Sequence, residues 1–238
     1  KVGRVLKWSD QSGADHDASQ SKPDQRPVLI DDAASGLPAV RFDGLRRFLD
    51  IDGQLLETAT CSIFAVVTDR HDGGHREIIS NWKRGQNVSS SMFLGLTSDD
   101  QVRFTDSFSN AGRIADRKQP FVLSAINATQ AISVFQNASK LGQRESGLPN
   151  RKLGTPWVIG QQGDINGEFW NGDIAELLVY DRALSVSEQH QVWSVLLNRY
   201  QLPTSVRTVN VDESNPDLLA LASLCHVLLN SNEFIYVD

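Results

Sequence analysis

Two tryptophans in this 238-residue chain stand beside polar side chains at the expected ends of strands. Trp82 lies between Asn81 and a Lys-Arg pair that ends in Arg84, and Trp170 directly precedes Asn171. A flat aromatic ring can stack on the apolar face of a sugar while amide and guanidinium groups bond the hydroxyls. These patterns make Trp82, Arg84, Trp170 and Asn171 the candidate ligand-binding residues. The alternative is that both tryptophans are core residues, because tryptophan is mostly buried in folded proteins. The other tryptophans are interpreted as packing residues: Trp8, Trp157 and Trp193.

Other residue types that carry chemistry form no recognisable centre in the sequence. Of the five histidines, the closest two, His71 and His75, flank a glycine turn and are not expected to share a helix face. The two cysteines, Cys61 and Cys225, have no zinc-ligand spacing and are interpreted as buried thiols. The chain contains no nucleophile elbow, phosphate-binding loop or dinucleotide fingerprint. It is therefore expected not to be an enzyme.

Acidic turns are the remaining candidates for a cofactor site. Calcium needs six to eight oxygen ligands, several of them from carboxylates. None of the acidic turns has the spacing of an EF-hand loop, so each is interpreted as a solvated turn and no cofactor is predicted. A structural calcium stays possible but unsupported. The turns contain Asp31 and Asp32, Asp43, Asp99 and Asp100, and Asp164 with Asn166.

The charge balance argues against two classes of partner. The chain has 23 Lys and Arg against 29 Asp and Glu, a net charge of -6, and its basic residues are scattered. Nucleic-acid surfaces need clustered basic residues, so no nucleic-acid partner is expected. No apolar run approaches the ~20 residues of a membrane span. The chain starts at Lys1 without an initiator Met, so we expect a piece of a longer protein with its targeting segment elsewhere.

Short runs rich in β-formers follow one another along the first 180 residues, separated by clusters of Gly, Asn and Asp. No helix interrupts them, which predicts an all-β sandwich of two antiparallel sheets. The predicted strands are Pro27–Ile30, Pro38–Phe42, Arg47–Ile51, Cys61–Asp69, Arg76–Lys83, Ser90–Thr97, Gln101–Asp106, Phe121–Asn127, Ala131–Gln136, Pro156–Gln161, Glu168–Trp170 and Ile174–Tyr180.

The last of these strands leads directly into a helix. Ile174–Tyr180 is apolar on both faces, which predicts a strand covered on both sides. Ser185 and Glu188 have the spacing of a capping box, and a helix is predicted from Val186 to Tyr200. Its apolar residues form one stripe, so we expect it to pack on the outside of the sandwich.

The C-terminal part of the chain divides from the sandwich by composition. Residues 203–213 are polar and predict a linker after a domain of residues 1–202. Asn215 is a candidate N-cap, and the run Leu218–Leu229 is apolar on nearly every face. Residues 214–238 are therefore predicted to be a C-terminal helical segment.

Motifs at both ends of the sandwich resemble those of laminin-G-like domains of the concanavalin A-like jelly-roll class. At the start they are Trp8–Gly13, Gln25–Pro27 and Gly36–Gly44, and at the end Gly172–Ser185. The resemblance covers roughly residues 1–202. It implies two curved antiparallel sheets in an accessory module that usually binds carbohydrate or protein, often in secreted or surface proteins.

The same resemblance allows two kinds of site, a catalytic centre and a calcium site, to be compared with those of related proteins. Related glucan hydrolases carry Glu-x-Asp-x-x-Glu on a strand, and the nearest match here, Asn171–Glu176, has Asn at the nucleophile position. Asp173 and Glu176 are therefore interpreted as hydrogen-bonding carboxylates. Many related jelly rolls hold calcium with the Asp of an Ile-Asp-Glu sequence, which is replaced here by Ile174-Ala175-Glu176. Related sequences often have acidic residues after Phe-Asp-Gly, whereas this chain has Arg46 and Arg47. The simpler expectation for this basic pair is a solvated strand end, and the alternative is that it attracts an acidic glycan or a partner carboxylate.

The tail from Leu219 to Tyr236 is similar to the C-terminus of large planctomycete-type multidomain proteins, which often carry cytochrome c-like regions. No haem motif occurs in this chain. Taken together, the resemblances imply a non-catalytic recognition module of a larger exported protein, at a secreted, periplasmic or cell-surface location. Its expected partner is carbohydrate or a cell-surface polymer. The alternatives are a structural or protein-interaction module that contacts neighbouring domains of its parent, and, less favoured, a glycan-cleaving enzyme.

Overall fold

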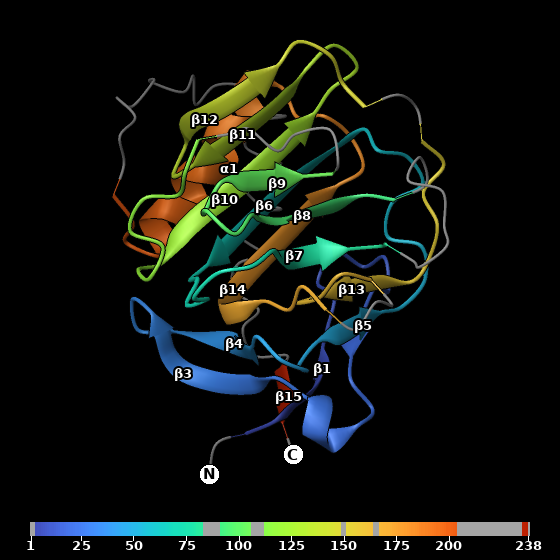
Figure 1. The fold of residues 1–238 in the computed structure, drawn as a ribbon, viewed down its shortest axis with the longest axis vertical. Coiled ribbons are helices and arrows are strands. Elements are labelled where there is room, and N and C mark those ends of the chain that lie inside the picture. The colour runs from blue at the N-terminus through green and yellow to red at the C-terminus, as the bar shows by residue number, and fades with distance from the viewer. Residues whose placement is uncertain are drawn as a thin grey trace.

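A computed structural model shows a two-sheet antiparallel β-sandwich with one helix against its outer surface (Figure 1). The structure describes residues 3–82, 91–105, 112–148, 151–163, 167–203 and 235–237. The predicted all-β class and sandwich architecture are confirmed. Within the described residues, no helix combines the length and apolar character that a membrane crossing requires.

One sheet has seven strands and contains the most deeply buried part of the chain. All seven residues of β6 and of β10 are buried, so these central strands are covered on both faces. In spatial order the strands are β12 (Ser139–Arg144), β11 (Ile132–Gln136), β10 (Phe121–Asn127), β6 (Cys61–Val67), β14 (Asn171–Tyr180), β4 (Leu37–Asp43) and β3 (Val28–Ala34).

The second sheet has eight strands and includes both ends of the described chain. Its last strand pairs with its first, with Ile235 opposite Trp8. In spatial order the strands are β15 (Ile235–Val237), β1 (Val5–Trp8), β2 (Ala18–Ser19), β5 (Leu49–Ile51), β13 (Trp157–Ile159), β7 (Arg76–Ser80), β8 (Phe93–Leu96) and β9 (Val102–Phe104). A short 3₁₀ helix, Pro23–Gln25, precedes β3.

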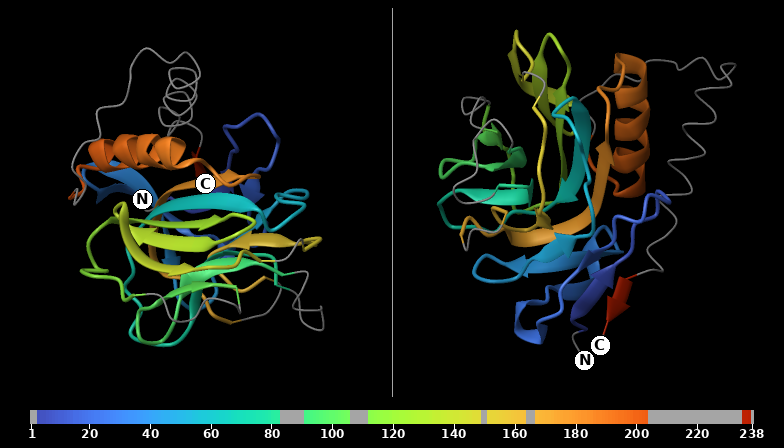
Figure 2. Two further views of the ribbon diagram at one scale, coloured as in Figure 1. Left: turned by 90° about the horizontal axis from the view of Figure 1, so that it is seen from above. Right: turned by 90° about the vertical axis from the view of Figure 1, so that its right-hand side faces the viewer.

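Two apolar clusters hold the layers together. The larger lies between the sheets and includes Phe42, Phe104 and Trp157. The smaller lies between the seven-stranded sheet and helix α1 (Val186–Arg199), where Trp193 packs against Phe135 at a ring-centroid distance of 4.7 Å. Figure 2 shows α1 on the outer side of this sheet, away from β7, β8 and β9. The predicted position of the helix is therefore confirmed.

The predicted capping box is also confirmed. The Ser185 side chain accepts from the Glu188 backbone N–H, and the Glu188 carboxylate accepts from the Ser185 backbone N–H at 2.7 Å. Arg182 donates two further hydrogen bonds to Glu188. These bonds, with that from Arg182 first, lower the pKa of Glu188 to about 2.

The structure describes one of the two cysteines, Cys61, and only a short part of the C-terminal segment. Cys61 is fully buried and unpaired, as its interpretation required, and burial raises the pKa of its thiol to about 12. Cys225, the linker from residue 204 and the helix predicted from 214 lie outside the described residues. The predicted helical segment 214–238 differs at its end, where Ile235–Val237 form strand β15 because they pair with β1.

Candidate functional site

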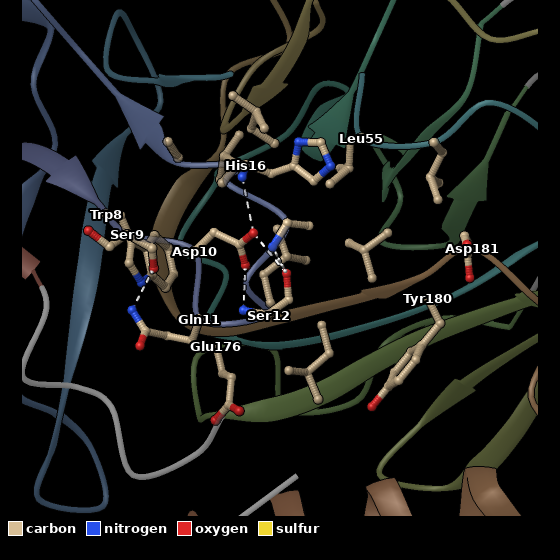
Figure 3. A pocket seen from close by; sticks show the side chains of 18 of the residues that line it. Trp8, Ser9, Asp10, Gln11, Ser12, His16, Leu55, Glu176, Tyr180 and Asp181 are labelled. Carbon is tan, nitrogen blue, oxygen red and sulfur yellow. Dashed lines mark hydrogen bonds between the residues drawn. The ribbon is translucent and has the colours of Figure 1, made fainter. Parts of the chain in front are cut away.

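A groove of about 430 Å³ opens beside the second half of β14 (Figure 3). The loop of residues 9–16 after β1 forms one wall, and the segment from Ile51 to Leu56 contributes a second side. In Figure 3, Tyr180 and Asp181 mark the end of the groove farthest from Trp8. We call this site the β14 groove.

The groove exists because β4 accompanies only the first part of β14. The β4 ladder ends at the pair Ile174–Val40, whereas β14 continues to Tyr180 along β6. An irregularity in the ladder between Ile174 and Glu176 marks the point of departure. Among the described strands, none pairs with the other edge of β14 beyond Ile174. The second half of this strand is half-buried, which corrects the prediction that both its sides are covered.

The floor of the groove is apolar. Trp8, Leu55, Leu177 and Val179 are partly buried and pack against the main core between the sheets. Their outer surfaces line the opening, so a ligand in the groove would meet an indole ring together with aliphatic side chains. Such a floor suits a ligand that has apolar faces.

The loop wall is organised by Asp10. Its carboxylate accepts hydrogen bonds from the backbone N–H of Ser12 at 2.8 Å, the Ser12 hydroxyl at 2.8 Å and the His16 backbone N–H at 3.0 Å. Burial alone would raise the pKa of Asp10, but these bonds outweigh it and lower the pKa. Asp10 therefore holds the loop in shape as a charged residue.

Two side chains of the loop add polar groups to the wall. Gln11 donates from Nε2 to the Ser9 carbonyl at 3.2 Å. His16 Nδ1 lies 3.0 Å from the Asp52 carbonyl, which can only accept, so this nitrogen carries the hydrogen. In the neutral ring the other nitrogen, Nε2, is then an acceptor. The wall offers both donors and acceptors to a polar ligand.

Glu176 lies where the groove meets helix α1. Its Oε2 accepts a 2.9 Å hydrogen bond from the Tyr200 hydroxyl and lies 3.9 Å from Arg199 Nε. Its Oε1 is buried and has no hydrogen-bond partner among the residues that the structure describes. Burial is the largest effect and raises the pKa of Glu176 to about 7. This carboxyl group is therefore partly protonated at neutral pH.

Residues 48–188 match the family model described as the concanavalin A-like lectin/glucanases superfamily. This chain belongs to that superfamily. The match includes Glu176 and the rest of β14, whereas Trp8 and the loop of residues 9–16 precede it. The groove of this superfamily domain thus combines a matched strand with an unmatched loop.

Solved structures share the fold at low sequence identity. An arabinofuranosidase complexed with arabinofuranosyl-α-1,2-xylobiose has a TM-score of 0.61 and 16% identity over 80% of this chain. This chain spans half of that protein (50%). Domain 4 of AbnA, an extracellular arabinanase of Geobacillus stearothermophilus, was solved with arabinotriose. It has a TM-score of 0.55 and 14% identity over 78% of this chain and 96% of its own. Among curated proteins, none matches this chain.

The residues predicted from sequence lie elsewhere in the superfamily domain. Trp170 is fully buried in the main core, so it cannot present a flat face to a ligand, which corrects its expected role. Its backbone N–H bonds to the Gly160 carbonyl, and its indole belongs to the core between the sheets. Trp82 is half-buried after β7, and Asn171 is half-buried at the start of β14. Ligand binding by these two residues stays a prediction, and Arg84 lies outside the described residues.

The groove was not predicted from the sequence because Trp8 was interpreted as a packing residue alone. Trp8 does pack on the core, but it also lines the opening. One available signal was the polar Ser-Asp-Gln-Ser-Gly run that follows Trp8 directly. The other packing assignments agree with the structure, since Trp157 and Trp193 are buried.

Asp173 and Asp43, two of the acidic residues considered for catalysis or metal binding, have partners within the protein. Asp173 is 2% exposed and accepts from Arg41 Nε at 2.6 Å and Arg41 Nη2 at 2.9 Å, as its interpretation as a hydrogen-bonding carboxylate required. Asp43 Oδ1 accepts three backbone N–H groups of its own turn, from residues 45 to 47. In the part of the chain that the structure describes, no group of three or more His, Cys, Asp or Glu residues could hold a metal ion. Asp164 and Asn166 lie outside that part.

Proposed function

We propose that this domain is a non-catalytic carbohydrate-recognition module and that the β14 groove receives the sugar. The observation that carries the proposal is the pairing of an apolar floor, including Trp8, with a wall of donors and acceptors from residues 9–16. Sugar rings present C–H faces that pack on an indole and hydroxyls that need polar partners. A volume of about 430 Å³ is in the usual range of small-ligand sites.

Arabinose-containing polysaccharides are the first ligands to test. Two proteins of the same fold were solved with arabinotriose and with an arabinofuranosyl-xylobiose, which supports this choice of sugar. The test measures binding of arabinan, arabinoxylan and arabinotriose to the full chain by isothermal titration calorimetry. Binding with a measurable affinity and no sugar release supports the proposal.

Variants locate the site. Trp8→Ala is expected to weaken binding by about tenfold or more, since aromatic anchors dominate such contacts. Trp8→Phe keeps a ring and is expected to retain most of the affinity, and Gln11→Ala tests the polar wall. Trp82→Ala is the matched comparison, because Trp82 is the surface candidate retained from the sequence. A loss confined to Trp82→Ala would move the site to the end of β7, and no binding by any polysaccharide would reject the function.

A second candidate function is a protein-interaction module without a small ligand. Among the described strands, none pairs with the edge of β14 opposite β6 beyond Ile174. This favours the second function, because an extended segment of another protein could add there as a strand. Glycan binding by the full chain separates the two functions. A glycan-cleaving activity would require sugar release that Glu176→Gln abolishes.

The proposal extends to the context of the module. We place it in a larger exported protein at a secreted, periplasmic or cell-surface location, with residues 203–213 as a linker to a C-terminal segment whose last strand returns to β1. The similarity of the tail to planctomycete-type multidomain proteins supports this context. Fractionation of the native source with an antibody against this chain tests the location.

A further inference from the structure

Four arginines gather at the corner where the first half of β14 meets β4. They are Arg41 on β4, Arg46 and Arg47 in the turn that follows β4, and Arg70 after β6. The carboxylates that contact them are Asp43 and Asp173. Among the residues that the structure describes, four positive charges against two negative ones leave +2 at this arginine corner, in a chain whose net charge is -6.

Asn171 ties the parts of the corner together. It pairs with Asp43 across the β4 ladder, and its carbonyl accepts from the Arg70 backbone N–H at 2.7 Å. Gly44 approaches so closely that a Cβ there would lie 2.7 Å from Asn171 Cβ. The turn that carries Arg46 and the loop that carries Arg70 therefore both contact one residue, which keeps their side chains in one region.

The buried carboxylate of Asp173 fixes two of the guanidinium groups. Arg41 donates to both of its oxygens, and Arg70 Nη2 lies 3.0 Å from Oδ2. A guanidinium has five N–H donors, so each arginine keeps donors that Asp173 does not use. The side chains of Arg41 and Arg70 remain 33% and 40% exposed, which makes those donors available to an outside acceptor.

The other two arginines contact Asp43 and differ from each other in exposure. Arg46 is 56% exposed and its Nε is 3.9 Å from Asp43, whereas Arg47 is 19% exposed at 3.2 Å. Both guanidinium groups face Asp43 Oδ2, while Oδ1 accepts three backbone N–H groups of the turn. Arg46 is therefore the most available cation of the corner.

A neighbouring ionic network does not cancel the excess charge. Asp69 and Asp100 contact Arg76 and Arg117, two negative charges against two positive ones. Arg76 and Asp69 are fully buried, so their charges are matched internally. The excess of +2 at the arginine corner stays uncompensated by this network.

We infer that the arginine corner binds an acidic polysaccharide through its carboxylates, at a site separate from the β14 groove. Guanidinium groups match carboxylates in shape and bind them with paired N–H donors, as Arg41 already does with Asp173. A single exposed ion pair contributes little, so several arginines must engage repeated carboxylates for measurable affinity. A uronic-acid polymer supplies such repeated carboxylates.

The test uses the full chain with polygalacturonate as the probe, at low and at raised salt. Arg46→Ala/Arg70→Ala is expected to weaken binding by about tenfold, and salt is expected to weaken the unaltered chain more than the variant. The charge-matched control is Arg113→Ala/Lys140→Ala, two exposed cations elsewhere, which should keep the affinity. Thermal unfolding of each variant confirms that it is folded.

Further binding measurements distinguish this inference from the proposed function. Trp8→Ala is expected to leave polygalacturonate binding unchanged, and neutral arabinan should be insensitive to Arg46→Ala/Arg70→Ala. The inference is overturned if polygalacturonate does not bind, or if the control variant loses as much affinity as the arginine variant. Tighter binding of heparin than of polygalacturonate would also overturn it, because the site would then select sulfate rather than carboxylate.

Discussion

The Tyr200 hydroxyl donates a 2.9 Å hydrogen bond to Glu176 Oε2 and so connects the C-cap of helix α1 to strand β14. Tyr200 is fully buried, and Glu176 lines the β14 groove. The helix that covers the seven-stranded sheet thus shares a titratable group with the candidate site. A change of protonation there alters the stability of the fold.

Glu176→Gln is expected to remove a pH dependence of stability. The pKa is raised from 4.5 to about 7 in the folded protein, so the folded state favours the protonated acid. The stabilisation is fully present below pH 4.5 and is lost as the pH rises to about 7, at most ~3 kcal/mol over the interval. Urea unfolding at pH 5 and pH 8 should show this loss in the unaltered chain and not in Glu176→Gln. Tyr200→Phe removes a bond that lowers this pKa, so the dependence should extend to higher pH.

Ser185→Ala is expected to destabilise the protein by about 1 kcal/mol, because it removes the side-chain acceptor of the capping box. Ser187→Ala is the control, since Ser187 is exposed on the same helix. Chemical denaturation with a helix-sensitive circular dichroism signal measures both. Equal stability of the two variants would show that the capping box contributes nothing measurable.

Acidification is expected to weaken the same helix end through Glu188. Its pKa is lowered to about 2 from 4.5, mainly by the Arg182 hydrogen bonds. This contribution to stability is present above pH 4.5 and is lost as the pH falls towards 2. Arg182→Ala should reduce the dependence of unfolding on pH in this window. An unchanged pH profile would exclude Arg182 as its main cause.

Gly160→Ala is expected to cost more stability than Gly36→Ala. Both glycines have positive φ, +87° and +80°, so both substitutions carry the same backbone strain. A Cβ at Gly160 would lie 2.4 Å from Phe42 Cδ1, whereas a Cβ at Gly36 would have no atom of the described residues within 4 Å. The difference in unfolding free energy therefore measures the clash with a buried ring, at about 1–3 kcal/mol. A difference near zero would show that Phe42 moves at no cost.

Ser124→Ala is expected to cost about 1–3 kcal/mol, because it leaves the buried Trp193 Nε1–H without its 3.0 Å acceptor. Trp193→Phe removes the donor as well as part of the packing. In the double variant the substitution at Ser124 should cost much less than it does alone. A double-mutant cycle by thermal unfolding measures this coupling. Fully additive effects would show that the hydrogen bond does not hold the helix to the sheet.

Local signals in the sequence predicted the closing strand and helix well. The capping box requires only residues three positions apart, and β6 and β10 are predominantly apolar runs whose burial follows largely from composition. Strands β1, β2 and β12 were missed because they are short or polar. Their pairing partners supply the evidence for them, and pairing is not local in sequence.

The site could not be predicted in the same way. Trp170 was expected at a strand end near the surface, but the strand begins at Asn171 and the indole turns into the core. Trp8 lines a groove only because β4 leaves β14 after Ile174. That departure depends on the ladder between two segments about 130 residues apart in the chain, and no local pattern reports it.

Strand β14 is ten residues long and carries two different chemistries in sequence. Asp173 anchors cationic side chains near its beginning, and Val179 contributes to an apolar opening near its end. At ~3.3 Å per residue, these positions are about 20 Å apart along one rigid backbone. A branched heteropolysaccharide that binds along this strand therefore needs charged and neutral units at this spacing. The direction of β14 sets the order in which the two kinds of unit must follow each other.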